Sequence, residues 1–144
     1  MNDSISLGKK YHCNSLSESK NFAFNLATTL APPYVLYLNG DLGTGKTFLC
    51  QSIGTFYETE LVNSSSFSRV TTSVGNINII HCDFYRTKPE DFFFEFQIEP
   101  LLIDPWVLLI EWGEVGGWDF GCREYEIEAK HISKNVRQYT LSMH

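Results

Sequence analysis

A single glycine-rich stretch constrains this chain more than any other part of it. It fits the phosphate-binding loop pattern G-x-x-x-x-G-K-[ST] at every fixed position and reads Gly40-Asp41-Leu42-Gly43-Thr44-Gly45-Lys46-Thr47. The glycines let the backbone curl so that successive N–H groups converge on phosphate oxygens, and the following helix directs its positive end at them. We expect Lys46 to reach the β and γ phosphates as a point charge that packs against nothing the core requires, and the Thr47 hydroxyl to bind Mg²⁺. The stretch predicts a protein that binds a nucleoside triphosphate.

The residues on either side of the loop fit the same interpretation. Residues 34–38 are typical of a buried strand, and residues 47–53 are typical of a helix. A glycine-rich turn that contains Lys-Thr by chance is the alternative, but it explains neither flank. We therefore predict nucleotide contacts at Asp41, Leu42, Gly43, Thr44, Gly45, Lys46, Thr47 and Phe48.

Length and composition limit what else the chain contains. With 144 residues, 43% of them hydrophobic, it has the size of one compact domain with its own core, so we predict a single domain over residues 1–144. No apolar run approaches the roughly 20 residues that a membrane span needs, and the polar N-terminus has no signal-peptide pattern. We expect a soluble, cytoplasmic protein that does not bind membranes. A formal net charge of −6 is not typical of a protein that holds a nucleic-acid backbone unaided, so a partner would hold any nucleic acid.

The cysteines give no pattern of their own. The chain has four, without any C-x-x-C pair, namely Cys13, Cys50, Cys82 and Cys122. Neither a zinc site nor a disulfide framework is indicated by this spacing. We expect reduced thiols in the core.

The first third of the chain contains signals for a strand and a helix. Residues 11–13 are typical of an edge strand. Ser15 and Glu18 have the spacing of a capping box, in which Ser15 accepts from first-turn N–H groups and Glu18 reaches back toward the start of the helix. Apolar residues then recur at helical spacing until Pro32-Pro33, which ends the helix because the residue before a proline is pushed out of the α region.

Two apolar runs after the loop helix end on carboxylates. The β-rich runs 67–74 and 77–83, linked by Gly75-Asn76, predict an antiparallel hairpin that joins the central sheet, and the second run ends on Asp83. Residues 106–111 form a further strand that ends on Glu111. An acid at the carboxyl end of an apolar strand is where a magnesium ligand or a water-positioning group lies in nucleotide hydrolases. Which acid has which task stays open at this point.

The remaining segments are less specific. Residues 89–96 predict a short helix whose phenylalanines are interpreted as core packing, because no Lys or Arg is interleaved with them as in a base-stacking surface. Residues 113–121 form a glycine-rich loop, either a nucleotide lid or a solvent-exposed turn. Residues 124–132 and 136–143 predict a final hairpin that turns near residues 133–135.

Four pieces in order make the chain resemble the TsaE family, also known as YjeE. Beside the phosphate loop, they are Ser64-Ser65-Ser66-Phe67 where the family has S-P-T-F/Y, His81-Cys82-Asp83-Phe84-Tyr85-Arg86 for its H-x-D-x-Y-R, and Ile110-Glu111-Trp112 for its h-E-W. The resemblance implies an α/β, P-loop NTPase-like three-layer domain with a mixed parallel and antiparallel central sheet. It also implies an ATPase that uses Mg²⁺ and serves TsaB and TsaD in the threonylcarbamoyladenosine (t6A) modification of tRNA, with tRNA reached only through that complex.

The same resemblance suggests roles for individual residues. Glu111 would complete the magnesium site with Thr47, Lys46 would act on the phosphates, and Asp83 would orient or activate the attacking water. Supporting or switch roles, on the nucleotide or a partner face, would fall to Ser66, Arg86 and Trp112. Ser65 stands where the family has proline, which puts the switch role in doubt.

Each role has a competing interpretation. If they have no functional role, Asp83 and Arg86 pair with each other on the surface, a contact worth about 0–1 kcal/mol. Likewise, Trp112 without a role at the site belongs to the core. Alternation directs His81 away from the face of Cys82, and we expect it to be structural or to have a minor supporting role. A small P-loop kinase and a nucleotide-dependent scaffold with little turnover remain open, whereas a regulatory GTPase needs an Asn-Lys-x-Asp that the sequence lacks. The sequence shows no obvious arginine placed to neutralise the charge that develops on the γ phosphate, so we expect slow hydrolysis by the chain alone.

Overall fold

A seven-stranded mixed sheet, in the order β1-β7-β6-β2-β5-β4-β3, forms the frame of the protein. The computed structural model describes residues 4–59, 69–73 and 75–144. The strands are β1 (Lys10–Cys13), β2 (Tyr34–Gly40), β3 (Val70–Thr72), β4 (Asn78–Asp83), β5 (Trp106–Glu111), β6 (Arg123–Ser133) and β7 (Val136–Met143). The helices are α1 (Leu16–Thr29) and α2 (Lys46–Phe56), and two short helical turns follow later, η1 (Phe94–Ile98) and η2 (Glu99–Leu101). The predicted α/β class with a mixed sheet is confirmed.

Strand β2 lies at the centre of the sheet and leads directly into the phosphate loop. It pairs in parallel with β5 on one side and with β6 on the other. Its first five residues and all of β5 are buried, as expected for the continuous apolar runs of parallel strands that are covered on both faces. β4 is parallel to β5, so β4, β5 and β2 all end at the same edge. This edge brings the phosphate loop and the two strand-terminal acids together.

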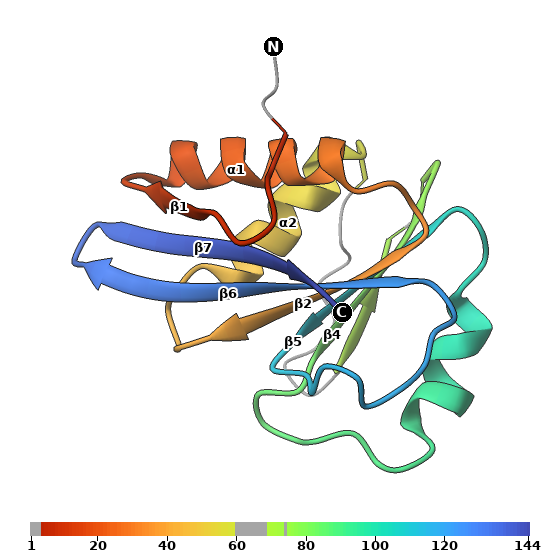
Figure 1. The fold of residues 1–144 in the computed structure, drawn as a ribbon. Helices are drawn as coiled ribbons and strands as arrows, with labels where there is room; N and C mark the ends of the chain where they lie inside the picture. Colours follow the sequence, from red (N-terminus) through yellow and green to blue (C-terminus); the bar gives the residue numbers. More distant parts are fainter. Residues whose placement is uncertain (1–3, 60–68, 74) are drawn as a thin grey trace.

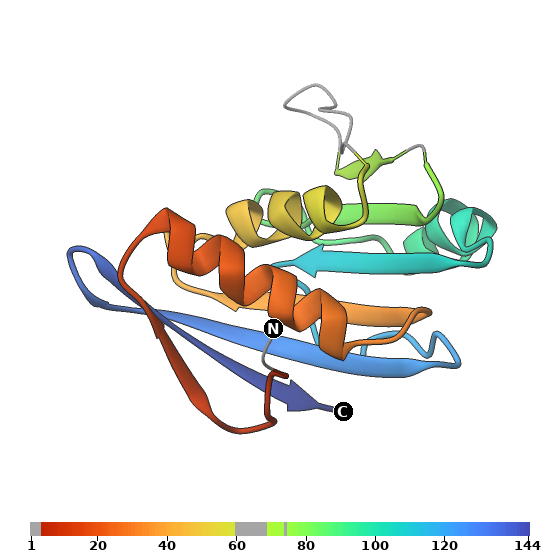
Figure 2. The same cartoon turned by 90° about the horizontal axis from the view of Figure 1, so that it is seen from above.

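The two faces of the sheet are covered differently. Figure 1 shows α1 and α2 together on one face, where Phe22 and Leu26 of α1 and Leu49 of α2 pack against Leu36 of β2 and other sheet residues. In Figure 2, viewed from above, α1 crosses over the strands of the C-terminal hairpin and β2. The opposite face is covered by η1, η2 and the connecting chain, with Phe93 and Ile98 packed on the strands. The third layer therefore consists of short turns and loops rather than long helices.

The N-terminal elements follow their sequence signals. β1 is an edge strand that pairs with β7, and α1 begins after Ser15, whose hydroxyl accepts from the N–H of Glu18 at 3.1 Å. The carboxylate of Glu18 accepts from the backbone N–H and the side-chain amide of Asn14, both at 3.3 Å. The capping bond of Ser15 is formed as predicted. The Glu18 carboxylate, however, accepts from Asn14, the residue before the N-cap, and not from the N–H of Ser15 itself.

Both predicted hairpins join the sheet. β3 pairs antiparallel with β4. Residues 67, 68 and 74 of the predicted first run lie outside the described residues. β6 and β7 form the long C-terminal hairpin, and its turn falls at Lys134 and Asn135. This hairpin carries the chain back beside the phosphate loop.

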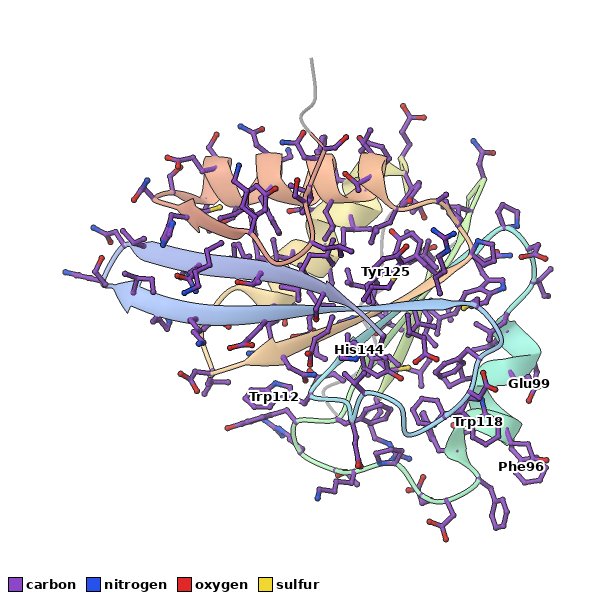
Figure 3. The ribbon with its side chains drawn as sticks, viewed as in Figure 1. Phe96, Glu99, Trp112, Trp118, Tyr125 and His144 are labelled. Carbon is purple, nitrogen blue, oxygen red and sulfur yellow. The ribbon has the colours of Figure 1, made fainter. Side chains whose placement is uncertain are left out.

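The phenylalanines at residues 92–96 do not all belong to the core, which corrects the packing interpretation. Phe93 is 3% exposed and packs edge-on against Phe84, whereas Phe92 and Phe96 are 63% and 69% exposed. Figure 3 shows Phe96 projecting outward from η1. Phe96 lies in the π-helical turn η1, and Phe92 lies in the turn that precedes it. Such turns direct consecutive side chains to different sides, so a run of phenylalanines cannot all face the sheet.

The cysteines behave as free thiols. Cys13, Cys50 and Cys82 are buried, and Cys122 is half-buried. Among the helices of the described residues, none has the length and apolar character to cross a membrane.

Candidate nucleotide site

The predicted phosphate loop connects the carboxyl end of β2 to the first turn of α2. Gly45 is the N-cap of α2 and has φ +91°, a conformation that suits glycine. No side chain of the described residues accepts a hydrogen bond from the N–H groups at this helix end. The first N–H groups of α2 therefore lack a side-chain cap. Free N–H groups at a helix N-terminus form a binding site for anions such as phosphate. The local geometry is the one that the sequence motif predicts.

Strand β7 supports the loop from the side. The hydroxyl of Tyr139 donates to the carbonyl of Thr44 at 3.0 Å, and Arg137 Nε donates to the carbonyl of Gly43 at 3.4 Å. The loop is closed internally by a bond from the Thr44 hydroxyl to the carbonyl of Asp41 at 2.8 Å. Two residues from the far end of the chain therefore hold the loop.

Lys46 is far more embedded than a bare point charge, which corrects the expectation drawn from the motif. It is 4% exposed, and its ammonium donates to the carbonyls of Gly40 and Asp41 at 2.9 and 2.6 Å and to Thr44 Oγ1 at 3.3 Å. The ammonium also lies 4.3 Å from the centre of the Trp112 ring, a cation–π contact. Burial lowers the pKa of Lys46, while neighbouring carboxylates, Glu111 first among them, oppose that shift.

The carboxylate of Glu111 lies at the centre of the site. Thr47 Oγ1 donates to its two oxygens at 2.9 and 3.0 Å, so the two residues predicted to bind magnesium are in direct contact. His81 Nε2 lies 2.6 Å from Glu111 Oε2, and because a carboxylate oxygen only accepts, the imidazole is the donor. Glu111 is 2% exposed, so these bonds hold a buried charge.

Asp83, the second predicted acid, lies opposite Glu111 in the parallel register of β4 and β5. It is exposed, and its Oδ1 accepts from the N–H of Tyr85 at 2.9 Å, which fixes the carboxylate in a local turn. No ion pair joins Asp83 to Arg86 among the residues that the structure describes, so the surface-pair interpretation is wrong. Arg86 is exposed and lies outside the cavity described next.

These residues line a cavity of about 320 Å³, large enough for part of a small-molecule ligand. Six of the predicted nucleotide-binding residues lie in its wall, namely Leu42, Gly43, Gly45, Lys46, Thr47 and Phe48. The wall also contains the predicted metal ligand Glu111, together with Asp83 and Trp112. Asp41 and Thr44 belong to the loop but not to the cavity wall. Ser66 and the rest of its segment lie outside the described residues.

Trp112 is part of the site and not a plain core residue. It is half-buried, has φ +60°, and packs its ring against Tyr85 with centroids 4.9 Å apart. Figure 3 shows it at the end of β5. The glycine-rich loop that follows does not line the nucleotide cavity. Its Gly117 and Trp118 line a second cavity of about 550 Å³, which shares Trp112 with the first.

Sequence reasoning missed several residues of this site. Leu16 and Ser19 of α1, with Arg137 and Tyr139 of β7, also line the cavity. His81, predicted to be structural or to have a minor supporting role, directly contacts the predicted magnesium ligand. Strand alternation carried a usable signal for it, because it places His81 and Asp83 on the same face. No local pattern marks the residues of β7.

Comparisons with known proteins identify the family to which the chain is similar and agree with its fold. The model of the family described as "Threonylcarbamoyl adenosine biosynthesis protein TsaE" matches residues 13–139. The tRNA threonylcarbamoyladenosine biosynthesis protein TsaE of Rickettsia bellii is 40% identical over 105 residues, which make up 71% of this chain and 72% of the relative.

Two further comparisons reach beyond that genus. The protein of the same name from Nostoc is 35% identical over 99 residues, covering 65% of this chain and 61% of the relative, so the match spans less than two thirds of its length. Among solved structures, the crystal structure of Bacillus subtilis YdiB superposes with a TM-score of 0.69 at 23% identity, covering 98% of this chain and 88% of that one. The latter likeness shows the fold.

Proposed function

The chain belongs to the TsaE family, and from that membership we propose that it binds ATP with Mg²⁺ and hydrolyses it in the t6A modification of tRNA. The relatives named above are t6A biosynthesis proteins, so the pathway follows from the family. The observation that carries the ATPase proposal is the contact of Thr47 Oγ1 with both oxygens of Glu111 at the start of α2. It joins the phosphate loop to a buried acid from a neighbouring strand.

The loop and the first turn of α2 would hold the triphosphate. Backbone N–H groups around Gly43 and Gly45, with those that begin α2, would bind phosphate oxygens. Lys46 would exchange its bonds to the carbonyls of Gly40 and Asp41 for the β and γ phosphates. The loop carbonyls hold the ammonium close to the position where it is needed.

The donor set at Glu111 fits Mg²⁺, which prefers oxygen ligands such as a threonine hydroxyl and a carboxylate. A bound Mg²⁺ would neutralise charge that develops on the phosphates. Thr47 and Glu111 would hold it, and His81 would keep the carboxylate oriented through its hydrogen bond. Asp83, exposed to the same cavity and fixed by the N–H of Tyr85, would orient the attacking water.

Two observations weigh against the alternatives left open by the sequence. A P-loop kinase normally clamps its phosphates with lid arginines, but among the described residues only Arg137 lines the cavity, and it comes from β7 rather than from a lid. Arg69 is bound elsewhere, to the carboxylate of Glu90 and to the carbonyl of Lys88. A scaffold that does not hydrolyse ATP needs no second carboxylate beside the proposed metal site, yet Asp83 lines the cavity there. The hydrolase interpretation uses both acids.

The partners belong to the proposal as well. We infer that the chain acts with TsaB and TsaD in the cytoplasm and reaches tRNA only through them, since its net charge of −6 does not favour a phosphate backbone.

Calorimetric titration with ATP, with and without Mg²⁺, tests the nucleotide site. Binding should depend on Mg²⁺ and should be lost or severely weakened in Lys46→Ala, whereas Lys134→Ala, in the exposed turn of the C-terminal hairpin, should bind like the original chain. Because Lys46 is buried and hydrogen-bonded, circular dichroism must show that the variant is folded. A folded Lys46→Ala chain with unchanged affinity would overturn the proposal.

A further inference from the structure

Behind the wall of the nucleotide cavity, three donor atoms of different chemistry converge. They are the thiol of Cys50, an imidazole nitrogen of His81 and a carboxylate oxygen of Glu111, all within 4.8 Å of one another. Cys50 is 0% exposed, Glu111 is 2% exposed, and the His81 side chain is 12% exposed. We propose that these residues form a binding site for a thiophilic divalent cation, for which Zn²⁺ is the best match.

The cluster arises because three elements meet at one point. Thr47 and Cys50 are three residues apart on α2 and so share the helix face that packs on the sheet. His81 and Glu111 come from adjacent parallel strands and project from the same face toward α2. The sequence spacing hides this arrangement, because the three ligands come from separate elements and no C-x-x-C or His pair is involved.

The ligand set selects the metal. Zn²⁺ takes sulfur, imidazole nitrogen and carboxylate oxygen in tetrahedral sites, whereas Mg²⁺ takes oxygen ligands almost exclusively. Bonds of about 2.0–2.3 Å place tetrahedral ligand atoms roughly 3.3–3.7 Å apart. The most distant donors, up to 4.8 Å apart, must therefore draw together by about 1–1.5 Å. His81 Nε2 and Glu111 Oε2, now 2.6 Å apart, must separate by about 1 Å so that the ion can stand between them. Side-chain rotations of Cys50 and His81 can supply both movements. The fourth position falls to water or to the Thr47 hydroxyl, which already contacts Glu111.

The surroundings favour a cation and provide a route for it. Glu111 and Asp83 outweigh the single charge of Lys46, and Glu111 lines the open cavity, so an ion can enter from solvent. The Cys50 thiol makes no hydrogen bond within the described residues and is therefore not held by another partner. Binding forms a Zn–S bond and releases the thiol proton to the buffer, and the hydrogen of His81 Nε2 moves to Nδ1 so that Nε2 can donate its lone pair.

Glu111 belongs both to this cluster and to the proposed magnesium site, so Zn²⁺ and Mg²⁺ compete for its carboxylate. A Zn²⁺ ion that engages the carboxylate removes a ligand from the Thr47–Glu111 pair, so Zn²⁺ should weaken Mg²⁺-dependent ATP binding. This consequence rests on the proposed function, whereas the site itself does not, and the two are separated by measuring Zn²⁺ binding without nucleotide.

The test titrates the full chain, freed of metal by a chelator, with Zn²⁺ alone and with Co²⁺ as a spectroscopic probe. We expect one ion per chain, proton release on binding, and a sulfur-to-cobalt charge-transfer band. Cys50→Ser should remove the band and His81→Gln should lower the affinity at least about tenfold. The matched variants Cys122→Ser and His144→Gln, which remove a half-buried thiol and an exposed imidazole elsewhere, should change neither.

A measurement on the unaltered chain covers the case in which Cys50→Ser fails to fold. X-ray absorption at the zinc edge of the Zn²⁺-loaded protein should show one sulfur at about 2.3 Å with nitrogen and oxygen at about 2.0–2.2 Å. A first shell without sulfur, or a cobalt band that persists in folded Cys50→Ser and disappears in Cys122→Ser, would overturn the proposal.

Discussion

The Thr47 hydroxyl donates to both carboxylate oxygens of Glu111, at 2.9 and 3.0 Å, across the space between the first turn of α2 and the end of β5. A hydroxyl that bridges both oxygens holds the carboxylate in one orientation. We propose that the same two groups bind Mg²⁺, in which case the fold itself orients the pair for the ion.

The first prediction concerns this pair. Glu111→Gln removes the charge but preserves the shape, and it should weaken Mg²⁺-dependent ATP binding by about tenfold or more, because a bond to a charged group contributes about 1.5–3 kcal/mol. Thr47→Ala should have an effect in the same direction, whereas Thr47→Ser keeps the hydroxyl and should bind nearly as well as the original chain. Calorimetry at several Mg²⁺ concentrations measures all three. Equal affinity in Glu111→Gln would remove this acid from the metal site.

Asp83 should fail in a different way. If it orients water, Asp83→Asn should still bind ATP but should release phosphate about 10²–10⁴-fold more slowly, the usual size of an acid–base contribution. Asp119→Asn is the matched control, because Asp119 accepts from the N–H two residues later just as Asp83 does. If Asp83→Asn instead lost Mg²⁺-dependent binding while Glu111→Gln lost only turnover, the two roles would be reversed.

The sequence was sufficient wherever local spacing determines structure. The motif placed the loop between β2 and α2, and the aliphatic runs that end on Asp83 and Glu111 placed both acids at one sheet edge. These inferences need only strand alternation, helix start signals and the rule that parallel strands end together.

Contacts between segments that are distant in the sequence could not be predicted from local patterns. Tyr139 bonds to Thr44 across 95 residues because β7 folds back beside β6, and no local pattern specifies where that hairpin lies. The contact of His81 with Glu111 likewise depends on β4 pairing with β5. The exposure of Phe96 depends on the π-helical turn η1 and that of Phe92 on the turn before it, and single residues do not encode either geometry.

The first glycine of the loop provides a stability prediction. Gly40 has φ +140°, and a Cβ at this position would lie 2.0 Å from the backbone oxygen of Ala129 in β6. Gly40→Ala should lower the free energy of unfolding by more than about 3 kcal/mol, because a central strand cannot move aside. Gly116→Ala, also at positive φ but with nothing within 4 Å, should cost only about 1 kcal/mol.

Chemical denaturation monitored by circular dichroism measures both glycine variants under the same conditions. Equal losses would mean that the cost comes from the backbone conformation alone and that the close approach of β6 to Gly40 is unimportant.

Trp112 should report on nucleotide binding. Its ring is 4.3 Å from the Lys46 ammonium, which must leave its loop carbonyls to reach a phosphate, so the fluorescence of the chain should change when Mg²⁺ and ATP are added. The change should disappear in Trp112→Phe and persist in Trp118→Phe, since Trp118 lines the other cavity. A signal that survives in Trp112→Phe would come from another tryptophan and would contradict the assignment of the change to the Lys46–Trp112 contact.

The central claim, an ATPase that serves a tRNA-modifying complex, is tested most directly by steady-state phosphate release from the purified chain, alone and with TsaB and TsaD. An arginine at the transferred phosphate contributes about 10³–10⁵ in rate, and here Arg86 lies outside the cavity while Arg137 is bound at the loop rim. We therefore predict slow release by the chain alone and a marked rise when both partners are present. The variants Arg86→Ala and Arg137→Ala then show whether an internal arginine contributes to the rise. Fast release by the chain alone, unchanged by TsaB and TsaD, would contradict the account.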